Sequence, residues 1–164
     1  MELSLDWGPI VKVSLAMFLG GLMGLERELA QKPAGLRTHI LVSGAASLLV
    51  VLGEIMIGQY SGDNALAKSV EADPIRIMGA VITGISFLGA GTIIFRDQGE
   101  TVEGLTTAAS ILFVAGINIG VALHQYLLAS ILTILAIVVL MGLGYLERFI
   151  AQFRQRYYDN TFND

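Results

Sequence analysis

Charged and hydroxyl side chains that could hold a ligand gather beside the ends of long apolar stretches. Arg37 and Thr38 open one such stretch, and residues 104–107 open another. Helix N-termini carry free N–H groups and a partial positive charge, so together with Arg37 they could hold a phosphate or a carboxylate. That anion could be Glu26 or Glu28, a lipid headgroup or a soluble ligand; the alternative is an internal network of salt bridges and caps. This first group comprises Glu26, Arg27, Glu28, Arg37, Thr38, Arg96, Glu103, Thr106 and Thr107.

A second group, Glu54, Asp73 and Arg76, lies near the other ends of these stretches. A charge at the centre of a membrane helix costs roughly 2.5–3.5 kcal/mol and less near an edge, so Glu54 should be paired or face water. We expect an ion pair with Arg76, because Asp73 before Pro74 has the pattern of a helix N-cap. The alternative is that Glu54 and Asp73 form the mouth of a cation path.

Residue types with catalytic chemistry are sparse in this sequence. There is no cysteine, and His39 and His124 are far apart, which disfavours a histidine metal site. No nucleophile–base set, phosphate-binding glycine loop or pair of catalytic carboxylates is evident, so we expect no enzymatic activity. The net charge of −4 leaves no basic footprint for nucleic acid.

Magnesium would need oxygen ligands, because it is a hard cation that keeps much of its water. No apolar stretch has an acidic residue near its middle, so the sequence does not support a magnesium path through one subunit. An oligomeric ring would change the number of oxygen ligands available to the ion. The metal site stays unassigned: magnesium is possible, and no other cofactor is expected. Asn118 is the most costly polar residue to bury and should face another polar group. The other polar residues inside the stretches are Ser43, Ser47, Thr83, Ser86 and Thr133.

Five long apolar stretches position these residues. A helix rises ~1.5 Å per residue, so about 20 residues cross the ~30 Å hydrocarbon core of a bilayer. Hydrophobic residues make up 54% of the chain and charged residues 15%. Thr101 is a candidate cap of the fourth helix. The sequence predicts an all-α polytopic membrane protein, a bundle of about five transmembrane helices at residues 9–25, 36–58, 75–95, 105–123 and 126–144.

Basic residues indicate the orientation of this bundle. With five spans the termini lie on opposite sides, and Lys and Arg concentrate on the cytoplasmic side. We therefore expect the N-terminus outside and the C-terminus in the cytoplasm, with an acidic outer loop at residues 59–73. Residues 1–144 form the predicted membrane domain, and residues 145–164 form a cytoplasmic amphipathic tail. The basic residues on the predicted cytoplasmic side are Arg27, Lys32, Arg37, Arg96, Arg148, Arg154 and Arg156.

Glycines are numerous for a helical protein, 19 in all. Gly20 and Gly24 are four residues apart, a spacing that lets helix backbones approach closely within one subunit or in a homodimer. Gly84, Gly89 and Gly91 lie in the third span. Because glycine costs about 1 kcal/mol relative to alanine inside a helix, these three favour either a kink or break, whose carbonyls could meet an ion, or close packing.

Four segments together resemble the MgtC/SapB family, specifically its N-terminal membrane domain. Their order and spacing match the family pattern from about residue 10 to residue 140. Ser86 stands where the family usually has glycine, and Leu112 where it often has tryptophan. Longer members carry a soluble C-terminal domain, which we do not expect in the short segment after the fifth span. The segments are residues 24–28 (GLERE), 32–39 (KPAGLRTH), 73–76 (DPIR) leading into 84–92 (GISFLGAGT), and 102–110 (VEGLTTAAS).

The resemblance implies a bacterial inner-membrane protein associated with growth at low magnesium and, in some pathogens, with survival inside host cells. Two hypotheses follow. In the first, the protein is a non-enzymatic regulator or interaction protein that affects magnesium-linked physiology by binding other membrane proteins or lipid. In the second, it is a small oligomeric transporter or channel for magnesium or another cation, with residues 84–91 at its core. We favour the first, because no charged transport path is evident, and we expect a homo-oligomer.

Overall fold

The computed structural model describes residues 6–60, 73–96 and 101–162, apart from the side chains of residues 60, 96, 101, 146–149 and 151–162. Features predicted for the N-terminal segment, the loop of residues 61–72, the turn of residues 97–100 and the side chains of the tail therefore lie outside the described residues. The prediction of an all-α protein is confirmed, apart from one short hairpin. The described elements are α1 (Trp7–Leu29), α2 (Leu36–Tyr60), α3 (Pro74–Ala90), β1 (Ile94–Arg96), β2 (Thr101–Glu103), α4 (Leu105–Ala122) and α5 (Tyr126–Phe162).

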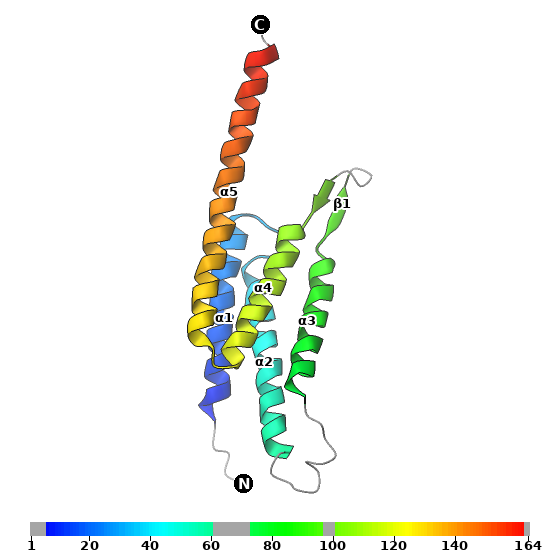
Figure 1. Ribbon diagram of the computed structural model, residues 1–164, viewed down its shortest axis with the longest axis vertical. Helices are drawn as coiled ribbons and strands as arrows, with labels where there is room; N and C mark the ends of the chain where they lie inside the picture. Colours follow the sequence, from blue (N-terminus) through cyan, green and yellow to red (C-terminus); the bar gives the residue numbers. More distant parts are fainter. Residues whose placement is uncertain (1–5, 61–72, 97–100, 163–164) are drawn as a thin grey trace.

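The helices run up and down beside one another, so that α2 and α4 share one direction and α1, α3 and α5 the other (Figure 1). The most extensive packing is between α1 and α2, and α4 contacts each of the other four helices. α3 and α5 lie on opposite sides of α4 (Figure 1). We call the end with the α1–α2 turn and the strands the hairpin end, and the end where α3 begins the Pro74 end.

The core lies where α1, α2 and α4 meet. α3 and α5 bury little of their surface: Phe87 on α3 is 84% exposed and Leu127 on α5 is 76% exposed. Large apolar side chains on the outside of a bundle suit lipid rather than water, because lipid tails are themselves apolar. The central core residues include Ala16, Leu19, Met23, Ala46, Val50, Val51, Ile111, Val114 and Ala115.

Four of the described helices are long and apolar enough to cross a membrane: α1, α2, α4 and the first 20 residues of α5. α3 is apolar but has 17 residues. At ~1.5 Å per residue it reaches about 25 Å, which is at the lower limit for a span. The chain is a multi-pass membrane protein, and α5 continues far beyond the bundle as an uninterrupted helix (Figure 1).

The third helix ends earlier than the sequence predicts, at Ala90 rather than at residue 95. Gly89 and Gly91 are poor helix formers, and the β-branched run that follows favours an extended backbone. Thr92 secures the end, because both its N–H, at 2.9 Å, and its hydroxyl, at 2.7 Å, donate to Gly89 O. The predicted break within residues 84–91 is thus a helix end, and α3 runs uninterrupted through Gly84.

Cap residues were predicted correctly at α3 but not at α4. Asp73 is the N-cap of α3, with Oδ1 accepting the N–H of Ile75 at 2.9 Å, and Pro74 is the first helical residue. The prediction of Thr101 as the cap of α4 is wrong, because Thr101 belongs to β2 and the N-cap is Gly104.

The hairpin between α3 and α4 was not predicted. Its strands pair antiparallel, with Phe95 opposite Val102. Gly104 follows β2 with φ of 90°, and a Cβ on this residue would collide with Thr92 O. Glycine alone tolerates both conditions, so Gly104 lets the chain pass from the hairpin directly into α4.

Two glycines bring α1 and α2 into close contact. A Cβ on Gly20 would lie 2.8 Å from His39 O, and a Cβ on Gly24 would lie 2.8 Å from Leu36 Cα. Small residues permit this approach, since lipid offers no hydrophobic drive for helix association. The predicted close packing of Gly20 and Gly24 within one subunit is confirmed.

The glycines of α3 differ from one another. A Cβ on Gly89 would lie 3.4 Å from Ala108 O, so Gly89 sits where α3 meets α4. Gly91 is the C-cap of α3. A Cβ on Gly84 would meet nothing within 4 Å, so close packing of Gly84 against the described part of this chain is wrong.

Candidate functional site

A charged pair lies in the interior at the hairpin end. Arg27 on α1 is 3% exposed; its Nη2 donates to Glu26 Oε1 at 2.7 Å, and its Nε donates to Glu26 Oε2. This two-point contact is the strong form of an arginine–carboxylate pair. Arg27 Nη1 has no partner among the described residues. A buried N–H without a partner is costly, so this nitrogen needs a water molecule or another acceptor.

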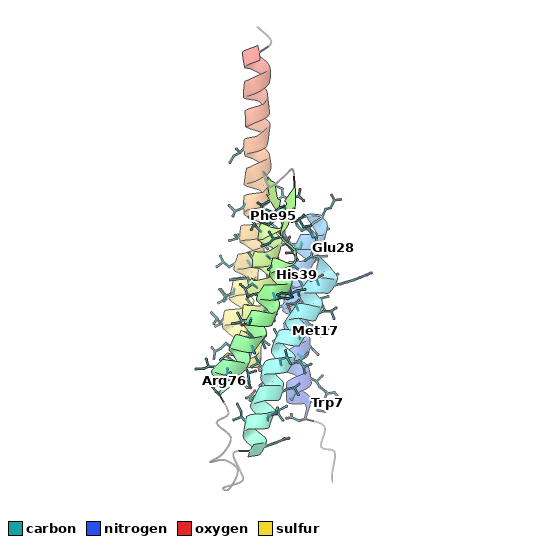
Figure 2. All side chains as sticks on the ribbon, turned by 90° about the vertical axis from the view of Figure 1, so that its right-hand side faces the viewer. Trp7, Met17, Glu28, His39, Arg76 and Phe95 are labelled. Carbon is teal, nitrogen blue, oxygen red and sulfur yellow. The ribbon has the colours of Figure 1, made fainter. Side chains whose placement is uncertain are left out.

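His39 on α2, labelled in Figure 2, links α2 to α4. The ring is fully buried. Its Nδ1 lies 2.9 Å from Gly35 O and its Nε2 lies 3.2 Å from Ser110 Oγ. Ser110 Oγ in turn lies 2.8 Å from Thr107 O. The contacts run from the first turn of α2 to the first turns of α4.

The direction of these hydrogen bonds depends on the form of the imidazole. Gly35 O can only accept, so Nδ1 carries a proton. In the neutral ring Nε2 is then an acceptor, and the Ser110 hydroxyl must turn toward it and leave Thr107 O. In the doubly protonated ring Nε2 donates to Ser110 Oγ, and the hydroxyl can donate to Thr107 O. The cluster can therefore couple a proton on His39 to the orientation of a hydroxyl on α4.

The residues predicted to hold an anion at this end are only partly brought together. Glu28 Oε2 accepts the N–H of Leu36, the first residue of α2, at 3.0 Å. Glu28 thus places a carboxylate at this helix N-terminus, one of the arrangements that the sequence allowed. Arg37 and Thr106 are exposed, and Thr38 is half-buried. A ligand-binding role for this group stays a prediction.

At the Pro74 end the predicted ion pair between Glu54 and Arg76 is wrong. Lys12 Nζ instead donates to Glu54 Oε2 at 2.9 Å and joins α1 to α2. Lys12 is 8% exposed, and a lysine inside an apolar helix needs an opposite charge. Arg76 is exposed at the start of α3 (Figure 2), and Asp73 caps the same helix.

Unpartnered oxygen atoms lie deeper in the bundle. Ser43 Oγ, Ser47 Oγ and Asn118 Oδ1 are buried and have no hydrogen-bond partner among the described residues. Asn118 Nδ2 donates to Val114 O, one turn back on α4, at 2.8 Å. Asn118 was expected to face another polar group, and the group that its Nδ2 meets is a backbone carbonyl of its own helix.

These oxygen atoms lie at different helix contacts, and Ser43 Oγ faces α1, because a Cβ on Gly20 would collide with it. His39 touches Ser110, 71 positions later, and the two helices run in the same direction. Since both rise ~1.5 Å per residue, Ser47 lies level with Asn118, and Ser43 lies between that level and His39.

Metal-binding geometry is missing from the described residues. No group of three or more His, Cys, Asp or Glu side chains there could hold a metal ion. The carboxylates of Glu26 and Glu54 are each occupied by a basic side chain. The unpartnered oxygen atoms of Ser43, Ser47 and Asn118 belong to hydroxyl and amide groups, which suit water or hydrogen bonding between helices rather than tight binding of a divalent cation.

Three residues of this arrangement were missed by sequence reasoning. For Lys12 a signal was available, because Glu54 is the one acidic residue inside a predicted span and a buried lysine needs such a partner. His39 begins a polar series with Ser43 and Ser47, one residue per turn, which marks one face of α2. Ser110 carried no comparable signal, because its contact depends on how α4 sits against α2.

Comparisons with known proteins point to one family. The sequence model of the MgtC family matches residues 13–149. YhiD of Escherichia coli K12, named as a candidate magnesium transporter, is 36% identical over 132 residues, covering 78% of this chain and 58% of YhiD. SapB of Bacillus subtilis is 33% identical over 133 residues, covering 80% of this chain and 55% of SapB. MgtC of Brucella abortus is 37% identical over 117 residues, covering 69% of this chain and 43% of that protein.

The chain thus spans between 43% and 58% of the length of these three relatives. No solved structure gives a significant match. The matched residues include α2, α3 and α4 completely, together with the buried pairs at both ends of the bundle, except for Lys12, which lies just before the matched range.

Proposed function

This chain belongs to the MgtC family, and we propose that it acts in magnesium homeostasis as a non-enzymatic regulator or interaction protein of the bacterial inner membrane. The link to magnesium comes from a relative, YhiD, whose name describes a candidate magnesium transporter. The preference for regulation over transport comes from the interior of the bundle.

The pairing of the buried charges supports this proposal most directly. Lys12 holds Glu54, and Arg27 holds Glu26, each within hydrogen-bond distance. A path for magnesium needs oxygen ligands that can exchange with the hydration shell of the ion. Carboxylates that already bind a buried lysine or arginine are poor steps on such a path, because binding the ion there would take the carboxylate from that basic side chain.

The lipid-facing helices supply the contact surface that this function needs. α3 packs against α2 and α4, and most of its residues are exposed. Thr83 and Gly84 lie on this exposed side, and a Cβ on Gly84 would meet nothing within 4 Å. Small residues on a lipid-facing helix let another membrane helix approach closely.

The same surface favours a second candidate function, a homo-oligomeric magnesium transporter. If copies of the chain packed through α3, the residues around Gly84 would line the centre of the assembly. The cation path would then run between subunits and would not require the interior carboxylates. This candidate predicts that a bulky residue at Gly84 blocks both assembly and flux.

Magnesium flux into liposomes tests the proposal. Purified protein is reconstituted around a fluorescent magnesium indicator, beside Gly84→Leu and the control Gly142→Leu, whose Cβ also meets nothing within 4 Å but lies on α5. In parallel, each variant is expressed at low magnesium in a bacterial strain that lacks its own family member. A regulator restores growth and gives no flux above that of protein-free liposomes.

Flux that Gly84→Leu abolishes and Gly142→Leu keeps would overturn the proposal in favour of the oligomeric transporter. Restored growth without flux, lost in Gly84→Leu alone, would place a partner on the exposed side of α3. Size-exclusion chromatography of each variant shows whether the substitution altered folding or assembly.

A further inference from the structure

The hairpin between α3 and α4 has one apolar face that the bundle leaves uncovered. Phe95 on β1 is 70% exposed and Val102 on β2 is 42% exposed. These two residues are opposite each other in the antiparallel register, so they share one face of the hairpin. Since successive strand residues alternate between the two faces, the hairpin is amphipathic. The positions on the other face are Ile94 with Glu103 and Arg96 with Thr101.

The helix that leads into this hairpin is short for a membrane span. α3 has 17 residues and reaches about 25 Å, against a hydrocarbon core of ~30 Å. Because Gly89 lies against Ala108 and the two helices are antiparallel, α3 ends before the level at which α4 begins. The sequence nevertheless has no charged residue between Arg76 and Arg96. Residues 91–95 can therefore supply the missing length of about 5 Å, since an extended chain rises ~3.3 Å per residue.

The backbone of this connection is suited to the edge of the hydrocarbon core. The N–H groups of residues 91–93 donate to carbonyls at the end of α3 at distances between 2.9 and 3.1 Å. Backbone that enters hydrocarbon must satisfy its polar groups internally, and these three donors do so. β1 and β2, in contrast, form a sheet of two strands, and no other described strand covers its outer edges. These edges need water or lipid headgroups, so the hairpin itself suits the membrane interface.

We propose that this hairpin is an interfacial anchor, and that its Phe95–Val102 face inserts among the headgroups and upper acyl chains of the leaflet at the hairpin end. The hairpin projects from the ends of α3 and α4 (Figure 1), and Figure 2 shows Phe95 beyond the level of His39. The face follows directly on the lipid-facing surface of α3, which includes the exposed Phe87. Insertion buries apolar area in lipid while the other face stays in water. The anchor completes the crossing that α3 begins and is independent of the function proposed above.

Tryptophan fluorescence in lipid nanodiscs tests the anchor. The chain has one tryptophan, so Trp7→Phe gives a background in which a single probe is placed. The probe variants are Phe95→Trp, with Thr101→Trp on the other face and Phe87→Trp on α3 as controls. We expect phosphatidylcholine brominated near the headgroup to quench Phe95→Trp, and aqueous iodide to leave it unaffected. Thr101→Trp should show the reverse, and Phe87→Trp should respond most to bromine deeper in the acyl chain.

A second probe on the same face, Val102→Trp, leaves Phe95 intact and should behave as Phe95→Trp does. Circular dichroism and the thermal unfolding transition show whether each variant is folded. Equal quenching of Phe95→Trp and Thr101→Trp by iodide would place the apolar face in water and overturn the proposal. Protection of Phe95→Trp from iodide without quenching by brominated lipid would also overturn it, because protein rather than lipid would then cover the face.

Discussion

Buried charges in this bundle are paired across or along helices, and the pair between Lys12 and Glu54 shows how much such a contact depends on position. Arg76 carries the right charge, yet Lys12 makes the bond at 2.9 Å. The energetic reason is burial. Lys12 is nine-tenths covered and would lose most of its solvation without a carboxylate, whereas Arg76 remains exposed.

A double-mutant cycle measures this preference. We expect Lys12→Met and Glu54→Gln each to lower the free energy of unfolding by about 2 kcal/mol, because each leaves one partner without its hydrogen bond. The double variant should lose less than the sum, with a coupling energy of about 1 kcal/mol or more. The matched cycle of Glu54→Gln with Arg76→Gln should give additive effects. Strong coupling to Arg76 instead would contradict the assigned pair.

The contact of Ser110 with His39 can be separated from its bond within α4. Ser110 Oγ and Ser130 Oγ both bond to a carbonyl of the preceding turn, but only Ser110 also touches a side chain on another helix. Removing this buried contact should cost about 1 kcal/mol in Ser110→Ala. Ser130→Ala should stay within about 0.5 kcal/mol of the wild type. Thermal unfolding of both variants checks this, and equal losses would show that the histidine contact adds nothing.

At the scale of the helices, glycine positions divide into those that pack within the chain and those that face outward. The contact between α1 and α2 depends on Gly20 and Gly24, where a Cβ would meet atoms of α2 at 2.8 Å. Gly84 and Gly142 have open space instead. The sequence could predict the close approach at Gly20 and Gly24 from their spacing, but the same kind of pattern in α3 did not distinguish packed from exposed glycines.

Alanine substitutions test this division. Gly20→Ala should destabilise the protein by about 1–3 kcal/mol, because the added methyl group forces α1 away from α2. Gly142→Ala should be neutral or stabilising by up to about 1 kcal/mol, since alanine is the better helix former and nothing opposes its Cβ. Unfolding in a denaturing detergent, followed by loss of helical circular dichroism, ranks the two variants. A stable Gly20→Ala protein would mean that the two helices are further apart than described.

At the scale of the whole molecule, five alternating helices place the two described termini at opposite ends of the bundle (Figure 1). The topology depends on whether α3 crosses the membrane, because α3 has 17 residues and the other four helices have longer apolar stretches. If α3 crosses, the hairpin end and the Pro74 end face opposite sides of the membrane, and the buried pairs of Arg27 and Lys12 lie near opposite interfaces.

Single-cysteine labelling tests this topology, since the natural sequence has no cysteine. We expect a membrane-impermeant maleimide to label Arg76→Cys from the outside of intact spheroplasts. Arg37→Cys and Thr106→Cys, at the hairpin end, should react only after the membrane is opened, as the basic loops predict. Labelling of Arg76→Cys and Thr106→Cys from one side would show that α3 does not cross.

The sequence by itself determined the helices, because the signals for them are local. Apolar length predicted five spans, of which four are helices long and apolar enough to cross a membrane, and the cap at Asp73 with Pro74 located the start of α3 within a residue. Prediction was less successful where two local preferences compete. Glycines and β-branched residues ended α3 early, and a hairpin replaced the expected turn and cap before α4.

Tertiary structure decided which polar groups meet. A contact such as Lys12 with Glu54 or His39 with Ser110 needs a particular rotation and height of two helices, and both are set by the packing of all five. One residue along a helix turns a side chain by about 100° and moves it by ~1.5 Å, so no spacing within a single segment could select Lys12 over Arg76. An apolar cleft lined by Glu54, by residues of α2 and α3 and by Leu123 likewise becomes visible only when the helices are placed together.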